Sequence, residues 1–244
     1  MIERTSIPPT VTVTDQTVNT TGFSEQWHQQ VCELAEELAK LNREAETGRT
    51  IVAIGGASGS SKSTTAAVLQ HLLTPALSAT VVHVTLDGYH YPRSVLREQR
   101  DICGDPLLLH KGRFDTYDTP ALQRDLALFS AGRELAFPTY SRGTHDPVPE
   151  AIPCATGNAV LILEGLWLLF DATPWREIAN FYYDRTIFFD APAATRAENT
   201  ITRHARGGRA RADSERYYEE NDAKNAELIR QHVIPHDRDV FWEE

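Results

Sequence analysis

The chain has 244 residues, enough for one large domain or two small ones with a substantial core, and the composition of an ordinary soluble globular protein. Its formal net charge of −10 argues against a general surface for nucleic acid or anionic membrane, because both need a basic face. Three separate cysteines without a C-x-x-C pair argue against a disulfide framework and a thiolate zinc site, and predict reduced, buried thiols.

Residues 1–22 are rich in threonine, contain Pro8-Pro9 and show no helical period. They are expected to form a flexible arm or a loosely held edge strand ahead of a single domain over residues 23–244. No export or membrane signal is visible, since the longest apolar run, 159–170, is interrupted by Glu164. A cytoplasmic location is therefore expected.

The first predicted helix begins after Ser24, a residue able to cap it. Its apolar residues recur at steps of four and three: Trp27, Val31, Leu34, Leu38 and Leu41. Two heptads would also suit a short coiled coil, but that structure needs a longer repeat. A helix lying on a sheet is favoured.

Strand and helix patterns then alternate along the chain. Strands are expected at 50–54, 80–85, 159–163 and 186–189, and helices at 62–73, 121–129 and 193–206. Continuous apolar strands separated by helices predict an α/β fold with a parallel sheet covered on both faces. Ligands of such sheets bind outside the carboxyl ends of the strands, so the residues that follow each strand are the candidates for function.

A phosphate-binding loop is predicted between the first of these strands and its helix. The pattern G-x-x-x-x-G-K-[ST] is met at Gly56, Lys62 and Ser63, with Ser61 in place of the second glycine. Small residues let backbone amides converge on an anion at a helix N-terminus, while the lysine reaches the outer phosphates and the Ser63 hydroxyl serves Mg²⁺. A Gly/Ser linker, the alternative, does not explain the flanking strand and helix. The predicted nucleotide-binding set is Gly56, Ala57, Ser58, Gly59, Ser60, Ser61, Lys62, Ser63, Thr64 and Arg203.

Two carboxylates follow neighbouring strands. Asp87 would accept the proton of an incoming hydroxyl or order Mg²⁺ through water, with a plain Asp-Gly turn as the alternative. Glu164 ends a buried apolar run, where an unpaired carboxylate is costly, so a cation is expected beside it. Mg²⁺ is the favoured cation and an arginine ion pair the alternative. The predicted metal set is Ser63, Glu164 and Asp87.

Five arginines lie between residues 196 and 211 against a single acid, Glu198. With Gly207-Gly208 in its middle, this segment predicts a mobile lid over about 203–213 whose arginines close over a transferring phosphoryl group. A solvated basic loop is the alternative. The predicted catalytic set is Asp87, Lys62, Arg206 and Arg209.

The phosphoryl acceptor is expected to bind in an insertion of polar and aromatic residues over about 88–150. The predicted contacts are Tyr89, His90, Arg113, Asp118, Tyr140 and Arg142, joined by Arg196 from a later helix. The two loops of this insertion, 110–118 and 138–146, would also suit solvated charges.

Together these motifs resemble the P-loop kinase superfamily of uridine kinase, phosphoribulokinase and bacterial pantothenate kinase, from about residue 50 to 234. Residues 85–89 are similar to the pantothenate kinase segment that carries its catalytic aspartate, and residues 161–166 resemble the I-L-E-G-L strand end of the family. Residues 206–209 resemble the R-G-R turn of uridine kinases. Residues 111–118 are similar to a K-G-A-P-x-T-F-D segment of a bacterial nucleoside or fructose kinase-like branch. The uridine-binding pattern Y-D-F-x-x-H is only half present, as Tyr140 and His145.

The resemblance implies a three-layer α/β/α fold with an arginine-rich lid, and transfer of the ATP γ-phosphoryl group to a hydroxyl of a nucleoside, a sugar or a pantothenate-like alcohol. ATP and Mg²⁺ would be the cofactors and a small molecule the partner, with the oligomeric state open. One rival function is a switch that only hydrolyses nucleotide, which the missing N-K-x-D and L-S-G-G-Q motifs disfavour. Another is a catalytically silent nucleotide-binding module, for which Ser61 argues.

Overall fold

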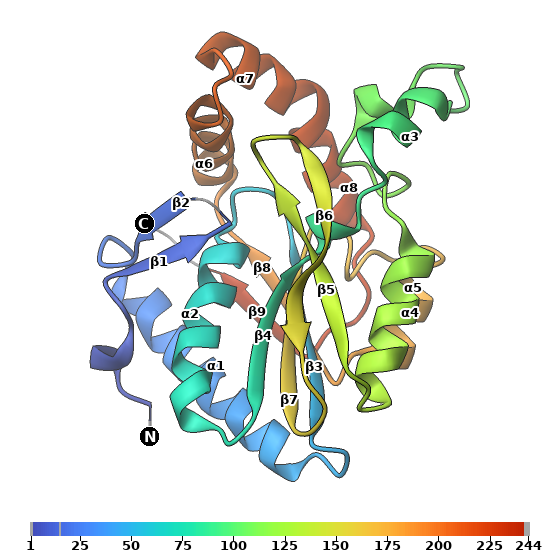
Figure 1. The fold of residues 1–244 in the computed structure, drawn as a ribbon. Helices are drawn as coiled ribbons and strands as arrows, with labels where there is room; N and C mark the ends of the chain where they lie inside the picture. Colours follow the sequence, from blue (N-terminus) through green and yellow to red (C-terminus); the bar gives the residue numbers. More distant parts are fainter. Residues whose placement is uncertain (1, 15, 242–244) are drawn as a thin grey trace.

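Five parallel strands form the centre of the molecule (Figure 1), in a computed structural model that describes residues 2–14 and 16–241. In sheet order the strands are β4 (Thr80–Thr85), β7 (Ala159–Glu164), β3 (Arg49–Gly56), β8 (Arg185–Asp190) and β9 (Arg238–Phe241). Every pairing between them is parallel. The predicted parallel sheet is therefore confirmed, and β9 extends it at one edge.

Helices cover both faces of the sheet (Figure 1). They are α1 (Glu25–Glu44) and α2 (Lys62–Ala76) on one side, and α4 (Thr119–Ser130) and α5 (Trp175–Tyr182) on the other. Alternate residues of a strand point to opposite faces. In β3, Ile51 and Ala53 belong to the core under α4 and α5, whereas Val52 and Ile54 belong to the core under α1 and α2. This three-layer arrangement confirms the expected α/β/α fold.

The first helix begins where its sequence predicts. The Ser24 hydroxyl accepts a hydrogen bond from the Trp27 amide at 3.3 Å, which caps α1. The predicted apolar stripe is buried at Trp27, Val31, Leu34 and Leu38, and Leu41 is partly buried. Because this stripe packs on α2 and the sheet, α1 is the sheet-covering helix that was favoured over a coiled coil.

The chain before α1 forms a separate antiparallel hairpin of β1 (Thr10–Val13) and β2 (Gln16–Asn19). Its strands do not join the central sheet. The side chains of Val11 and Val13 are buried in the same core as α1 and α2, so one face of the hairpin is apolar and covered. The prediction of an arm or an edge strand did not anticipate this hairpin, because two four-residue strands leave only a short alternating pattern.

Two further groups of elements lie above the carboxyl edge of the sheet, one of them α3 (Arg93–Glu98) and the turn between β5 (Leu135–Ser141) and β6 (Asp146–Cys154) (Figure 1). β5 and β6 pair antiparallel, and they belong with α3 to the insertion, whose remaining helix, α4, covers the face of the sheet. The segment predicted as a lid lies in α6 (Ala193–Arg206) and α7 (Arg211–Tyr217), and a π-helical turn joins α7 to α8 (Ala223–Gln231). These groups flank the strand ends where ligands of parallel sheets bind.

The expectation of buried thiols is correct only for Cys154. Cys103 is exposed in the insertion, and Cys32 is partly exposed on α1; all three are free. The reason is that Cys103 lies in a loop outside both hydrophobic cores. Across the described residues, no helix combines the length and the apolar character that a membrane span requires.

Candidate active site

The predicted phosphate loop joins β3, the central strand, to α2. Gly56 has a φ of +135° and Gly59 a φ of +77°, a region that side chains disfavour. A Cβ atom on Gly56 would overlap the carbonyl oxygen of Phe189, and one on Gly59 would overlap that of Arg196. Glycine is therefore required at both positions, by backbone conformation and by the close approach of β8 and α6.

Ser61 stands where the phosphate-loop pattern has its second glycine. Its φ of +65° and ψ of +18° are left-handed, and it is the residue immediately before α2. For a residue with a Cβ atom this conformation costs about 1–2 kcal/mol. The serine thus adopts a conformation natural to glycine, and its effect is a strained backbone at the start of α2.

Lys62 is the first residue of α2, and its side chain is buried against the loop. The Nζ atom donates to the carbonyl oxygen of Ala57 at 2.7 Å and lies 3.4 Å from the Ser60 hydroxyl. Burial lowers the pKa of Lys62 to about 8, although the nearby carboxylate of Glu164 acts to raise it. The amine is therefore held at the mouth of the loop, where a phosphate oxygen would replace the carbonyl as its partner.

A cavity of about 360 Å³ opens beside the first turn of α2. It is lined by Val13, Gln16, Val18, Asn19, Gly22, Phe23, Gly59, Ser61, Lys62, Ser63, Thr64, Arg142, Asn199, Arg203 and Arg206. Four of these side chains are cationic, and none of the described lining residues is acidic. Its volume is within the range of small-molecule sites, and its charge favours a polyphosphate.

Glu164 ends β7 and is only 5% exposed. The strand register pairs it with Ile54 of β3 on one side and with Thr85 of β4 on the other, so it lies between the phosphate loop and the turn that holds Asp87. Among the described residues its carboxylate has no ion-pair partner within 4.0 Å, and the arginine alternative is not found there. An oxygen set of Ser63, Glu164 and Asp87 fits Mg²⁺, which prefers carboxylates and hydroxyls.

Asp87 lies in the turn after β4, with its side chain 48% exposed and its Oδ1 3.8 Å from the Nε2 atom of His90. His90 is buried, and its Nδ1 atom is 3.1 Å from the carbonyl oxygen of Thr116. A carbonyl only accepts, so we assign the ring proton to Nδ1, which leaves a lone pair on Nε2 toward Asp87. Burial lowers the pKa of His90 to about 4, so the imidazole is neutral at pH 7.

Aromatic and cationic side chains surround this pair. His90 stacks on Tyr117, with ring centroids 3.9 Å apart, and the ring of Tyr140 lies 6.0 Å away. Lys111 donates to the carbonyl oxygen of His145 at 2.7 Å, and its Nζ atom lies 5.0 Å from the centre of the Tyr140 ring. The predicted acceptor residues His90 and Tyr140 are thus brought together with Asp87.

The surroundings of His145 are strongly cationic. After burial, the charges that lower its pKa are those of Arg93, Lys111, Arg209 and Arg142. The acids in this neighbourhood are Asp87 and Asp146, both of which act on Lys111. Sequence reasoning did not select Lys111 or Arg93. The signal was present for Lys111, which begins the K-G segment, but nothing local distinguished Arg93 from the other surface arginines.

Three predicted acceptor contacts are engaged elsewhere in the structure. The Tyr89 hydroxyl donates to Asp125 at 3.0 Å inside the core, and the Asp118 carboxylate caps α4 by accepting from the Ala121 amide at 3.0 Å. The guanidinium of Arg196 is buried, donates to the carbonyl oxygen of Ala191 at 2.9 Å and lies 3.2 Å from the Asp190 carboxylate. These contacts hold the turns around the site.

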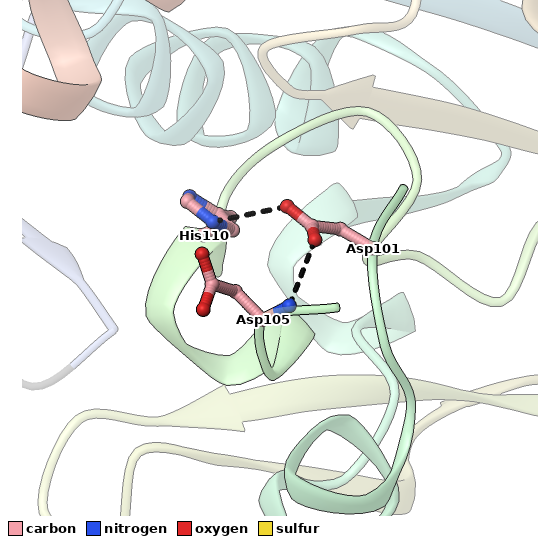
Figure 2. Close-up of side chains that lie close together, drawn as sticks. All are labelled: Asp101, Asp105 and His110. Carbon is pink, nitrogen blue, oxygen red and sulfur yellow. Dashed lines mark hydrogen bonds and ion pairs between the residues drawn. The ribbon is translucent and has the colours of Figure 1, made fainter. Parts of the chain in front are cut away.

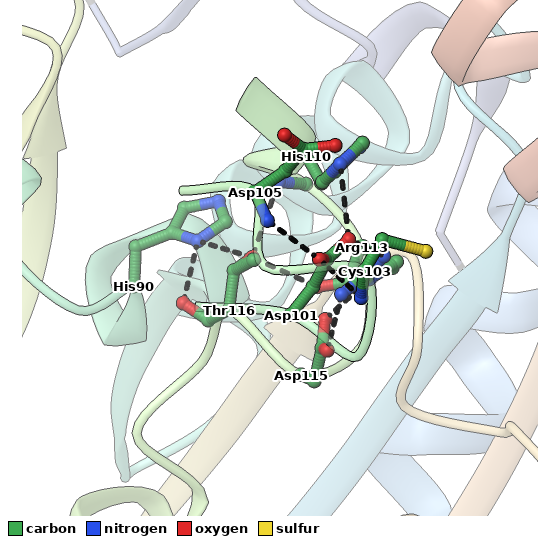
Figure 3. Close-up of polar contacts among 9 residues, drawn as sticks. His90, Asp101, Cys103, Asp105, His110, Arg113, Asp115 and Thr116 are labelled. Atoms are coloured by element: carbon green, nitrogen blue, oxygen red, sulfur yellow. Dashed lines mark hydrogen bonds and ion pairs between the residues drawn. The ribbon is translucent and has the colours of Figure 1, made fainter. Parts of the chain in front are cut away.

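Arg113, a fourth predicted contact, belongs to a polar network in the outer loop of the insertion (Figure 3). It donates twice to Asp115, at 2.8 and 2.7 Å, and lies 3.7 Å from Asp101. The Asp101 carboxylate also accepts from the amides of Cys103 and Asp105, at 2.9 and 3.0 Å. Arg113 therefore helps to hold a loop.

Asp101, Asp105 and His110 have ligand atoms close enough together to hold a metal ion (Figure 2). His110 Nε2 lies 3.3 Å from Asp101, however, and both carboxylate oxygens of Asp101 already have partners in the loop. The cluster is accounted for by the hydrogen bonds that shape residues 101–115.

The arginines of the predicted lid have different environments. Arg203 and Arg206 line the cavity. Arg209 lies over the ring of Tyr217, 4.0 Å from its centre, and Arg211 pairs with Glu198 at 2.8 Å on the surface. The Tyr217 hydroxyl donates to the carbonyl oxygen of Lys111 at 3.2 Å. The predicted lid and α7 thus contact both the cavity and the loop at Lys111.

Comparisons with known proteins agree with this fold. A family model described as the phosphoribulokinase / uridine kinase family matches residues 51–213. The chain is 32% identical over 198 residues to the uncharacterized protein YggC of Escherichia coli, covering 80% of this chain and 79% of that protein. It is also 32% identical over 152 residues to a pantothenate kinase of Streptococcus pneumoniae, covering 62% of this chain and 48% of that enzyme. A solved structure from Silicibacter sp. TM1040, provisionally named as a fructose transport system kinase, has a TM-score of 0.77 at 26% identity, covering 86% of this chain and 98% of that one.

Proposed function

The chain belongs to the phosphoribulokinase and uridine kinase family, and from this premise we propose that it transfers the γ-phosphoryl group of ATP to a hydroxyl of a small anionic metabolite, with Mg²⁺. Family membership makes the protein a P-loop kinase, a phosphotransferase with an alcohol group as acceptor, and implies ATP use. The observation that carries the finer proposal is a cavity in which the phosphate loop and the lid arginines meet.

The phosphate end of the proposed site is formed by Lys62, Arg203 and Arg206, which line the same cavity as the first turn of α2. Phosphoryl transfer requires that the charge on the nonbridging oxygens of the transferring group is neutralised and that the reactants are aligned. It requires little covalent chemistry from the protein. Lys62 would exchange its bond to the Ala57 carbonyl for a phosphate oxygen, and the two arginines would stabilise the equatorial oxygens of the transferring group.

Mg²⁺ would be held by oxygens of Ser63, Glu164 and Asp87, directly or through water. The support is the buried carboxylate of Glu164, which has no ion-pair partner among the described residues and is costly without a cation. When bound, Mg²⁺ would offset the negative charge of the phosphates. The protein contributes the position of the three ligands, on neighbouring segments at one edge of the sheet.

The proposed base is Asp87, which would accept the proton of the attacking hydroxyl. His90 supports this role because the lone pair of its Nε2 atom faces the same place as the Asp87 carboxylate. A hydroxyl bound there would donate to one of these two acceptors. His90 would orient the acceptor, and Asp87 would take its proton as the oxygen–phosphorus bond forms.

The charge around this base favours an acceptor that carries a carboxylate or a phosphate. Lys111 is half-buried, and burial lowers its pKa while Asp146 and Asp87 oppose the shift. Arg93, Arg142 and Arg209 act on the same region. Lys111, Arg93 and Arg209 outnumber Asp87 and Asp146, the two acids that act on Lys111, in a protein of net charge −10. An anionic acceptor would be attracted to these cations, whereas a neutral nucleoside would gain nothing from their charge.

The test is a coupled assay of ADP release over matched acceptor pairs, in which each neutral alcohol or sugar is paired with its acid or its phosphate. We expect ADP release to require an acceptor, and the anionic member of a pair to have the higher kcat/KM. ADP release at the same rate without acceptor would favour the rival switch function. Preference for neutral acceptors would overturn the proposed acceptor class and leave the kinase activity standing.

A further inference from the structure

We propose that the N-terminal hairpin of β1 and β2, together with Phe23, forms the wall of the cavity that binds the base of the nucleotide. This inference rests on the proposed function, since it assumes that the phosphates of the same nucleotide bind at Lys62. It gives a role to residues 10–14 and 16–23, all of which precede the part of the chain matched by the family model.

The lining of the cavity divides by chemistry. The residues from α2 and α6 include Lys62, Arg203 and Arg206, all cationic. The described lining residues from the N-terminal segment are uncharged: Val13, Gln16, Val18, Asn19, Gly22 and Phe23. Figure 1 shows β1 and β2 lying across the end of α2 where that helix begins, beside α6. A nucleotide has the same division, with charged phosphates at one end and a flat, uncharged base at the other.

Phe23 is the aromatic residue of this wall. Its ring stacks on Trp27 with centroids 4.3 Å apart and an angle of 29° between the planes. Trp27 is fully buried, and its Nε1 atom donates to the Thr65 hydroxyl on α2 at 3.2 Å. The phenyl ring is therefore held in place relative to the phosphate loop. Aromatic side chains held in this way stack on nucleobases, and each such contact contributes substantially to affinity.

The hairpin itself is anchored rather than free to leave the cavity. Val13 is buried in the core shared with α1 and α2, and the Thr20 amide donates to the carbonyl oxygen of Pro9 at 3.0 Å. The Asn19 carboxamide accepts from the Thr21 amide at 2.8 Å and from its hydroxyl at 2.7 Å. This anchoring keeps the uncharged wall at a constant position relative to α2.

Gln16 supplies polar groups on this wall. Its side chain is partly exposed and lines the cavity, and it has no hydrogen-bond partner among residues 2–14 and 16–241. A carboxamide both donates and accepts, which matches the alternating donors and acceptors on the edge of a purine. The wall thus combines an aromatic face, two valines and two carboxamides, apolar and polar groups of the kinds that line small-molecule sites.

The experiment compares ATP with inorganic tripolyphosphate, which has the phosphates and no base, by calorimetric titration of the full chain. In Phe23→Ala we expect the Kd for ATP to rise about tenfold and the Kd for tripolyphosphate to change less than twofold. Phe23→Leu should fall between, and Gln16→Ala should weaken ATP alone by a few fold. The matched control is Phe181→Ala, which removes a 79% exposed phenyl ring on α5; it should change neither Kd.

Unchanged ATP affinity in Phe23→Ala, or equal losses for ATP and tripolyphosphate, would overturn the assignment of the base while leaving the kinase proposal intact. If wild-type protein binds neither compound, both proposals fail together. A second measurement does not depend on a variant that folds: irradiation of wild-type protein with 8-azido-ATP, followed by peptide mass spectrometry. The label is expected within residues 10–23 and should be displaced by ATP. A displaceable label confined to other segments would overturn the proposal.

Discussion

The carboxylate of Asp87 faces the lone pair of a neutral imidazole, because His90 donates its Nδ1 proton to the Thr116 carbonyl oxygen. Burial and stacking on Tyr117 hold that ring in place. The Asp87 carboxylate and the Nε2 atom of His90 would both be able to accept a hydrogen bond from a hydroxyl bound at the edge of the sheet that also carries the phosphate loop. At the scale of single residues, this pair is the part of the site on which the proposed chemistry depends most.

Replacement of Asp87 by Asn should lower kcat by roughly two to four powers of ten, the contribution expected of an acid/base group. The affinity for ATP measured in EDTA should change little, because Asp87 does not line the described cavity and its proposed bond to Mg²⁺ is then absent in both proteins. The measurements are steady-state kinetics with the identified acceptor and titration with ATP. Asp105→Asn, which alters an exposed acid of the same insertion, is the control and should keep wild-type turnover. Wild-type kcat in Asp87→Asn would remove Asp87 from the role of base.

Replacement of Ser61 by Gly should raise the free energy of unfolding by about 1 kcal/mol, because glycine adopts the left-handed conformation without the cost of a Cβ atom. Part of the gain is offset by the greater entropy of the unfolded chain. Ser61→Ala keeps the Cβ atom and should show no gain. Denaturant unfolding of the three proteins measures the difference. Equal gains in both variants would attribute the effect to the hydroxyl and not to the backbone.

The buried imidazole of His90 should make stability depend on pH below neutrality. Its pKa is about 4 in the folded chain and 6.5 when exposed, so between these values the unfolded chain binds more protons. Stability is fully present above pH 6.5 and falls as the pH decreases toward 4, by about 3 kcal/mol in all. His90→Asn should flatten this dependence in urea unfolding between pH 4 and 7. An unchanged slope would assign the effect to other groups.

At the scale of elements, the arginines of the predicted lid lie in two different environments on α6 and α7. Arg203 and Arg206, at the end of α6, line the cavity, whereas Arg211 at the start of α7 pairs with Glu198 on the surface. The Gly207-Gly208 turn separates the two groups, and Tyr217 connects α7 to the loop at Lys111. The bond from Tyr217 to that loop gives the lid a contact on the acceptor side, which would couple acceptor binding to closure.

Replacement of Arg206 by Ala should lower kcat more than it weakens ATP or acceptor binding, because the proposed role is to neutralise charge that develops in the transition state. A loss of at least tenfold in kcat is expected, by the standard of arginines that act on transferring phosphoryl groups. Arg211→Ala removes an arginine of the same segment that is paired at the surface, and should stay near wild type. Equal changes in kcat and in ground-state affinity for Arg206→Ala would argue against a lid.

At the scale of the whole molecule, the cavity is built from segments that lie far apart in the chain. The hairpin, the phosphate loop, the insertion and α6 each contribute to its lining. A ligand that contacts all four would favour the folded state over any state in which one of them has detached. Ligand binding and global stability should therefore be strongly linked.

Saturating Mg²⁺ and ATP should stabilise the protein by about 3 kcal/mol at a hundredfold excess of ATP over its Kd. ATP with EDTA should stabilise it less at the same ATP concentration, since Glu164 would then lack its proposed cation. Thermal unfolding followed by circular dichroism measures both. Glu164→Gln removes the charge and is the matched variant, in which the difference between Mg²⁺ and EDTA should shrink. The same difference in that variant would separate Glu164 from the metal site.

The sequence by itself determined the layered fold and the phosphate loop. Apolar strands that alternate with helices are buried in a parallel sheet covered by those helices, and the order of the chain then places Gly56, Asp87 and Glu164 at one edge. The loop is also local, since nine consecutive residues between a strand and a helix carry its pattern. Such features depend on neighbours in the chain, which a sequence displays directly.

Only the tertiary structure decided which charged and aromatic side chains face the cavity. The Tyr89 hydroxyl and the Asp118 carboxylate are groups that could bind a substrate. In the structure, however, Tyr89 donates to Asp125 in the core and Asp118 caps α4. Phe23 shows no distinguishing local pattern, yet it lines the cavity. Lys111 begins a recognisable K-G segment, but only the fold sets its side chain beside Tyr140. The physical reason is that each polar group takes the partner that folding brings within hydrogen-bond distance, and those partners come from distant parts of the chain.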